Sequence, residues 1–140
     1  MSKFLGPLDV REEDEFGGLF QLLAPLAYQS DMLRDTITVP AGFHTDFASV
    51  PRLPIIYLTE GGKGNKAAVV HDWLYSSGNV DRKTADEVLR EALIASGYSR
   101  FTANLFYAAV RVGGTSFWHA PKMPQPTQVR RMMRNRVPAA

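Results

Sequence analysis

The hydrophobic pattern of this chain changes period near residue 64, and this change limits the folds that it can adopt. Before that point, residues 35–39 alternate threonine with branched apolar residues, which is the period of a half-buried strand. After it, residues 65–75 contain no helix breaker, and later apolar residues recur at helical spacing. The pattern predicts an α+β fold, in which a small N-terminal antiparallel β-meander precedes three helices.

The expected strands lie within residues 16–48, where we predict three or four short antiparallel strands. Residues 40–42 (Pro-Ala-Gly) are typical of a turn. We therefore expect residues 43–47 to return as the hairpin partner of residues 35–39.

The three expected helices follow the glycine-rich residues 60–64. The first covers residues 65–75, and a short loop at residues 76–80 predicts that the second helix packs antiparallel to it. Asp81 is the predicted N-cap of the second helix, which ends at Gly97, and Ser99 opens the third. Spacing predicts the inward faces as Ala85, Val88, Leu89, Ala92 and Leu93 in the second helix, and Phe101, Leu105, Ala108, Ala109 and Val112 in the third.

Length and composition set the class of protein. The 140 residues, 45% of them apolar, suffice for one domain, predicted at residues 1–118 with an extended basic C-terminal arm at 119–140. The absence of cysteine excludes disulfide scaffolds, thiolate zinc sites, iron–sulfur ligation and cysteine nucleophiles. The start of the chain does not resemble a secretory signal, and no apolar run reaches the ~18–20 residues that cross a bilayer. We expect no membrane span and synthesis in the cytoplasm.

Charge is divided unevenly along the sequence. Residues 1–91 hold 9 Lys/Arg and all 14 Asp/Glu (−5), whereas residues 92–140 hold 7 Lys/Arg and no acid (+7). The proline- and arginine-rich arm is either a solvated tail or a segment that docks on an acidic surface. A protein neighbour is favoured over nucleic acid, because no aromatic residues are interleaved with the arginines. The predicted partner-binding residues are Lys122, Arg130, Arg131, Arg134 and Arg136.

His71, Asp86 and Tyr75 are the candidate catalytic residues. His71 and Tyr75 are four residues apart and share one face of the first helix. A hairpin symmetric about residues 78–79 places His71 opposite Asp86, and Tyr75 opposite Arg82. A carboxylate bonded to one imidazole nitrogen fixes the tautomer and raises the basicity of the other, which can then take a proton from water. The alternative is a satisfied polar cluster that fixes the register of the two helices.

Asp72 and Asp46 are the candidate metal ligands. Asp72 directly follows His71 and could hold a hard cation that polarises a carbonyl or phosphoryl oxygen. Asp46 and Ser49 could reach the helix pair from the strands as further polar ligands, or both could cap the turn before Pro51. If the chain is an enzyme, calcium and zinc are the candidate ions, and the sequence does not choose between them.

Three segments carry a resemblance to a family found in tailed phages and prophages, known as domain of unknown function 1353. They are residues 45–52 (TDFASVPR), 67–75 (AAVVHDWLY) and 85–86 (AD), and the resemblance runs from about Gly42 to Trp118. It implies a phage origin. The second and third segments also resemble the phospholipase A2 active site, in which a His-Asp-x-x-Tyr helix meets a later Ala-Asp. That resemblance implies His71 as base, Asp72 as calcium ligand and Asp86 as orienting carboxylate.

Two functions from different classes follow. We favour a structural or accessory component of a tailed-phage particle, in its tail, baseplate or connector region. Such a component would reside in the virion and dock on other virion proteins through its basic arm. The alternative is a small metal-dependent hydrolase that cleaves a lipid ester or cell-wall bond during entry or lysis, with water activated by His71.

Overall fold

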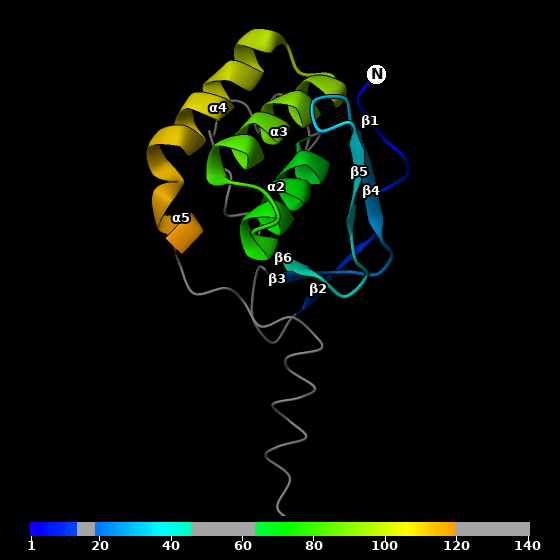
Figure 1. Cartoon of the computed structure of the whole chain (residues 1–140). Helices are drawn as coiled ribbons and strands as arrows, with labels where there is room; N and C mark the ends of the chain where they lie inside the picture. Colours follow the sequence, from blue (N-terminus) through cyan, green and yellow to red (C-terminus); the bar gives the residue numbers. More distant parts are fainter. Residues whose placement is uncertain (14–18, 46–63, 120–140) are drawn as a thin grey trace, which may run out of the picture.

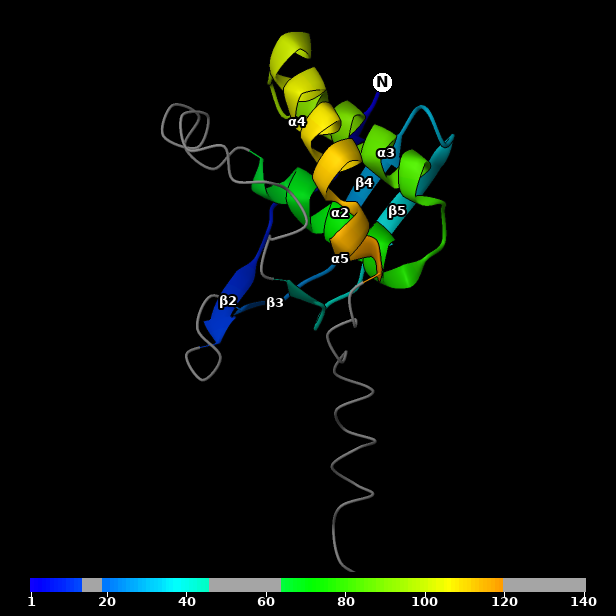
Figure 2. The same ribbon diagram turned by 90° about the vertical axis from the view of Figure 1, so that its left-hand side faces the viewer.

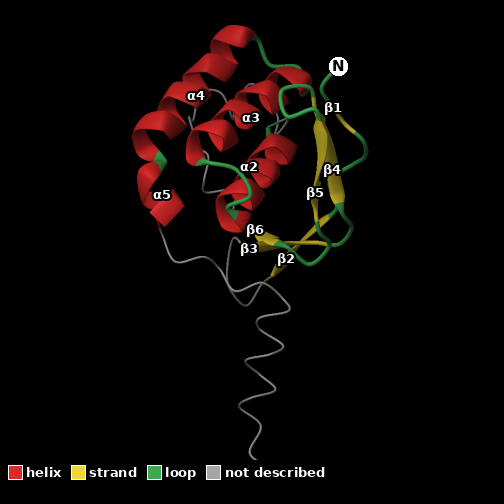
Figure 3. Cartoon of the chain, viewed as in Figure 1, coloured by secondary structure: helices red, strands yellow, loops and turns green. Residues whose placement is uncertain are grey.

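The computed structural model describes residues 1–13, 19–45 and 64–119 (Figure 1). The described strands are β1 (Lys3–Phe4), β2 (Val10–Glu13), β3 (Leu19–Leu22), β4 (Leu26–Ser30), β5 (Asp35–Val39) and β6 (His44–Thr45). The described helices are α2 (Asn65–Ser77), α3 (Arg82–Ala95), α4 (Arg100–Gly113) and the short α5 (Thr115–His119). Strands thus precede helices along the chain, which confirms the predicted α+β fold (Figure 3).

The strands form two small antiparallel sheets, ordered β1-β4-β5 and β2-β3-β6. In β4 alternate side chains are buried, from Leu26 through Tyr28 to Ser30, as expected for a strand with one face on the core. Ile37 and Val39 continue this inward face in β5. The β1-β4-β5 sheet therefore presents an apolar face to the helices.

The predicted hairpin between residues 35–39 and 43–47 is wrong. β6, which includes Thr45, pairs with β3 instead. Gly42 has a φ of 87° and donates its N–H to the Leu22 carbonyl at 2.7 Å, so the chain turns from β5 toward the second sheet. Strands β1 and β2 lie before residue 16, outside the region where strands are predicted. The sequence does not indicate them, because such short segments have no clear alternation of their own.

Capping residues set the helix boundaries. The Asp81 side chain accepts a hydrogen bond from the Thr84 N–H at 2.9 Å and caps α3, and Ser99 caps α4 in the same way. Gly78 and Gly97 follow α2 and α3 with φ values of 65° and 102°, in the left-handed region that favours glycine. The predicted boundaries at Asp81, Gly97 and Ser99 are confirmed.

Helices α2 and α3 pack on the β1-β4-β5 sheet, and α4 packs on α3 at the outer side of the molecule (Figures 1 and 2). Glu91 joins α3 to the sheet, because its carboxylate accepts hydrogen bonds from the hydroxyls of Tyr28 and Ser30, both at 2.7 Å. The predicted inward residues of α3 are confirmed as fully buried; they are Ala85, Val88, Leu89, Ala92 and Leu93.

The predicted inward face of α4 is wrong. Phe101 is 73% exposed and Val112 is 87% exposed, and Leu105 and Ala108 also face solvent. Ala109, the remaining residue of the predicted face, is only partly buried. Since α4 has apolar residues on two opposite sides, spacing alone does not choose between them. The side that the structure buries is formed by Ala103, Phe106 and Val110.

The prediction of no membrane span is consistent with the described helices. The longest of them have 14 residues. In this part of the chain no helix has both the length and the apolar character needed to cross a membrane.

Candidate functional site

An imidazole and a carboxylate meet at the seam between α2 and α3. His71 lies in the middle of α2, and Asp86 lies one turn into α3. His71 Nε2 is 2.7 Å from Asp86 Oδ1, and both side chains are fully buried. The predicted facing of these two residues is confirmed, whereas their catalytic role stays a prediction.

Asp86 also accepts hydrogen bonds from a second residue of α2 and from α4. The Tyr75 hydroxyl donates to Asp86 Oδ1 at 2.6 Å, and Arg111 Nη1 donates to Oδ2 at 2.8 Å. Arg82, one turn before Asp86, places its Nη1 3.6 Å from Oδ2. We call His71, Tyr75, Asp86 and Arg111 the Asp86 cluster. Three helices thus converge on one carboxylate.

Arg82 holds the end of α4 beside this cluster. Its two terminal nitrogens donate to the carbonyls of Val110 and Arg111 at 3.2 and 3.3 Å. Carbonyls in the last turn of a helix lack intrahelical partners and form the negative end of its dipole, so a guanidinium is well placed there. This contact brings Arg111 within reach of Asp86 and turns Val110 toward the core.

Arg111 is absent from the predicted site. The only signal for it in the sequence is a basic residue in the last turn of the third helix. That signal does not indicate a partner 25 residues earlier, at Asp86.

Burial and hydrogen bonding set the charge states of the cluster. Burial lowers the pKa of His71 below its ordinary 6.5 and outweighs the opposing effect of Asp86. Burial raises the pKa of Asp86, but the hydrogen bonds from His71, Tyr75 and Arg111 are stronger together and leave its pKa below 3.8. Burial and the bond to Asp86 raise the pKa of Tyr75 above 10.0. Near neutral pH, His71 is therefore a neutral imidazole, Asp86 is an ionised carboxylate and Tyr75 keeps its hydroxyl proton.

These charge states fix the tautomer of His71. An ionised carboxylate only accepts hydrogen bonds, so the hydrogen of the neutral ring is on Nε2 and is donated to Asp86. Nδ1 then carries the lone pair and is the nitrogen that can take up a proton. The arrangement is that of a general base oriented by a carboxylate.

Asp72 does not belong to the Asp86 cluster. It is one residue beyond His71 and therefore rotated by about 100° around α2. The buried Thr45 hydroxyl donates to Asp72 Oδ2, which ties β6 to α2. Thr45 is therefore a buried polar partner of Asp72. The sequence indicates Thr45 only as the first residue of the segment 45–52.

The described residues do not form a metal site by themselves. Calcium takes about six to eight oxygen ligands, whereas Asp72 and Thr45 offer two oxygen-bearing side chains. Within residues 1–13, 19–45 and 64–119, no group of three or more His, Asp or Glu could hold a metal ion. The other candidate ligand, Asp46, lies outside these residues, as do Ser49 and the arm residues Lys122, Arg130, Arg131, Arg134 and Arg136.

Gly114, between α4 and α5, lies against the hydroxyl end of Tyr75. A Cβ at this position would meet the Val110 carbonyl oxygen and would be 2.6 Å from the Tyr75 hydroxyl. Trp118 of α5 packs edge-on against the Tyr75 ring, with centroids 5.1 Å apart. The end of α4 and the start of α5 therefore pack closely over Tyr75.

The substitution Gly114→Ala should lower the free energy of unfolding by about 1–3 kcal/mol, because the added methyl displaces Tyr75 or the end of α4. Gly113→Ala is the matched control, since a Cβ at Gly113 has no atom within 4 Å. Urea unfolding of both variants measures the difference. Equal effects of the two substitutions would contradict the close packing over Tyr75.

Mild acid should destabilise the protein through His71. The pKa of His71 is lower in the folded state than the 6.5 of the unfolded chain, so the unfolded state binds more protons below that pH. The free energy of unfolding therefore falls as the pH falls through 6.5, whereas Asp86 adds a loss in the same direction only below 3.8. Urea unfolding at about pH 7.5 and about pH 5.5 isolates the histidine effect. The fall should be smaller in His71→Gln, and a wild-type protein that gains stability in acid would rule out the neutral imidazole.

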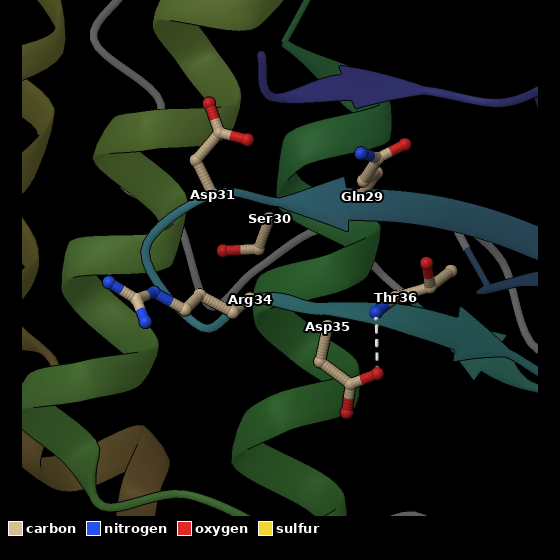
Figure 4. A pocket seen from close by; sticks show the side chains of 6 residues that line it. All are labelled: Gln29, Ser30, Asp31, Arg34, Asp35 and Thr36. Atoms are coloured by element: carbon tan, nitrogen blue, oxygen red, sulfur yellow. Dashed lines mark hydrogen bonds between the residues drawn. The ribbon is translucent and has the colours of Figure 1, made fainter.

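Two surface hollows lie away from the Asp86 cluster. One, of about 370 Å³, is at the turn between β4 and β5, where the side chains of Asp31, Arg34 and Asp35 point away from one another (Figure 4). The other, of about 340 Å³, lies between this turn, α3 and the start of α4. The first does not gather polar groups around one point as Asp86 does, so the Asp86 cluster remains the candidate site.

Comparison with known proteins places the chain in a family. The model of the family described as Protein of unknown function (DUF1353) matches residues 20–110, well over half of the chain. The chain belongs to the DUF1353 family. The predicted family is thereby confirmed, and the DUF1353 match includes His71, Tyr75 and Asp86 but ends one residue before Arg111. No curated protein and no solved structure matches the chain.

Proposed function

We propose that this DUF1353 protein is a small hydrolase, in which His71 activates water for attack on a lipid ester or a cell-wall bond. The observation that carries the proposal is the 2.7 Å contact between His71 Nε2 and Asp86 Oδ1. This contact orients the ring and makes Nδ1 the proton acceptor.

The proposed reaction on an ester has two proton transfers. His71 Nδ1 takes a proton from water as the water oxygen bonds to the carbonyl carbon, and the ionised Asp86 stabilises the imidazolium that forms. The imidazolium then returns the proton to the leaving oxygen as the ester C–O bond breaks, which restores neutral His71. Tyr75 and Arg111 are positioning residues, because they hold the Asp86 carboxylate and not the substrate.

The local similarity to phospholipase A2 supports the lipid ester as one of the two substrate classes. In both, a His-Asp-x-x-Tyr helix meets an aspartate on an antiparallel neighbour, and here Tyr75 and His71 share Asp86 Oδ1. The same similarity suggests calcium at Asp72. Because the described residues do not complete such a site, the reaction above contains no metal step.

The test uses the purified full chain with phospholipid in mixed micelles and, separately, with purified cell walls. Each assay is run without metal, with calcium and with zinc. We expect turnover of one substrate class, with a rate that declines in acid as the imidazole becomes protonated, at a pH below the ordinary histidine value of 6.5 because burial lowers the pKa of His71. Rates no higher than those of His71→Gln in every condition would refute the proposal.

A second candidate is a structural or accessory component of a tailed-phage particle that docks through residues 119–140. The complete burial of His71 and Asp86 favours it, since a sealed polar cluster can serve only to fix the register of α2 and α3. This candidate predicts no turnover in the assays above. It also predicts that purified particles contain the chain.

A further inference from the structure

Strand β5 is the longest open edge among the described strands. It ends the sheet ordered β1-β4-β5, and no other described strand lies beside it. The other open edges resist pairing with another chain, because β1 and β6 have two residues each and β2 carries the exposed charges of Arg11 and Glu12. β5 has five residues, Asp35–Val39, with neither lysine nor proline. Such an edge is a template for another strand unless some group protects it.

The register of the sheet shows which backbone groups of β5 bond to β4. The Leu5 N–H donates to the Ala27 carbonyl at 3.0 Å, so Ala27 turns its backbone groups toward β1. Bonding directions alternate along an antiparallel strand, and the next residue, Tyr28, therefore turns its groups toward β5. Tyr28 stands opposite Ile37, so Ile37 is a residue that bonds to β4.

The two neighbours of Ile37 turn their backbone groups toward the open edge. Thr36 and Thr38 each point an N–H and a carbonyl away from β4, and both residues are exposed. One of these groups is occupied, because Asp35 Oδ1 accepts a hydrogen bond from the Thr36 N–H at 2.8 Å. Figure 4 shows the Asp35 carboxylate on the side of β5 away from β4, with this bond as a dashed line. Among the described residues, the outward N–H of Thr38 has no partner.

This edge is complementary to itself. A twofold axis at Ile37 sets Thr36 of one copy opposite Thr38 of the other, so that outward donors meet outward acceptors in antiparallel strands. Threonine then meets threonine, and no like charges stand opposite each other. Registers shifted by two residues are poorer, because they pair Thr38 with Arg34, whose φ is 53°, or Thr36 with Pro40, which has no N–H.

We propose that Asp35 closes the β5 edge against a second copy of the chain. The Thr36 N–H is one of the two donors that each copy would contribute to the paired edges, and the Asp35 carboxylate occupies it. The second copy cannot use this donor unless the bond within the chain breaks first. Asp35 therefore keeps the β1-β4-β5 sheet from joining that of another molecule. This role is independent of the proposed hydrolysis, because Asp35 lies away from the Asp86 cluster.

The test compares the apparent masses of full-chain variants by sedimentation velocity over a range of protein concentrations. Asp35→Ala frees the Thr36 N–H, and its mass should rise toward about twice that of the wild type as the concentration increases. Asp31→Ala is the matched control, since Asp31 lies in the adjoining turn and pairs with the N-terminus of Met1. It also removes one negative charge, and it should keep the mass of the wild type.

Two further variants separate the hydrogen bond from the charge. Asp35→Asn loses the charge but keeps an oxygen that can accept from the Thr36 N–H, so it should stay monomeric. The double variant Asp35→Ala, Thr38→Pro also removes the second outward donor. It should return to the mass of the wild type, because proline is tolerated at an edge position whose N–H faces away from the sheet.

Four results would overturn the proposal. The first is an Asp35→Ala variant that keeps the mass of the wild type at every concentration. The second is association of Asp35→Asn or Asp31→Ala to the same extent as Asp35→Ala, which would assign the protection to charge alone. The third is association that persists in the double variant, which would place the contact elsewhere. The fourth is a thermal unfolding midpoint that falls in Asp35→Ala as the chain associates, which would assign association to unfolded chains.

Discussion

Replacement of Asp86 by alanine should lower the free energy of unfolding by about 3–5 kcal/mol. The carboxylate accepts hydrogen bonds from His71, Tyr75 and Arg111, and its side chain is fully buried. Without it, two neutral donors and one guanidinium remain in the interior without their acceptor, and each loses hydration that nothing replaces. The end of α4 should loosen as well, because Arg111 is attached to Asp86.

Glu87→Ala is the matched control for this loss. It removes a carboxylate from the next position of α3, whose side chain is partly exposed and lines a surface hollow. We expect a change within about 0.5 kcal/mol for it. Asp86→Asn keeps the shape and one acceptor oxygen, so its loss should be intermediate. Denaturant unfolding monitored by circular dichroism gives all three values, and similar losses for Asp86→Ala and Glu87→Ala would contradict the central position of Asp86.

Replacement of His71 by glutamine should reduce hydrolysis by about 100- to 10,000-fold, if His71 is the base that we propose. Glutamine can still donate a hydrogen bond toward Asp86, but its side chain does not take up a proton near neutral pH. The binding of substrate should change little, so the loss should appear in kcat rather than in KM. Steady-state rates on the substrate found for the wild type measure it.

His44→Gln is the histidine control, because His44 lies in β6 and outside the Asp86 cluster. Tyr75→Phe separates positioning from chemistry, since it removes one donor to Asp86 and leaves the imidazole in place. We expect a smaller rate loss in Tyr75→Phe than in His71→Gln, with the acid limb of the pH profile shifted. If His71→Gln lowers the unfolding midpoint but leaves the rate unchanged, the cluster is structural and the second candidate function gains support.

The sequence by itself determined the features that depend on neighbours a few positions apart. The caps at Asp81 and Ser99 and the glycine at Gly97 each act within one helical turn, so composition and spacing identify them. The facing of His71 and Asp86 is also local in origin, since a short loop leaves an antiparallel hairpin little freedom of register.

Only the tertiary structure decided the features that have two nearly equal local solutions. The pairing of β6 with β3 competes with a hairpin to β5, and both satisfy the backbone of a two-residue strand. Helix α4 has two apolar sides, either of which could face the core. The contacts of Arg82 and Arg111 with distant groups decide which side is buried. Such contacts join residues about 25 to 29 positions apart, and a pattern read over one helical turn contains no information about them.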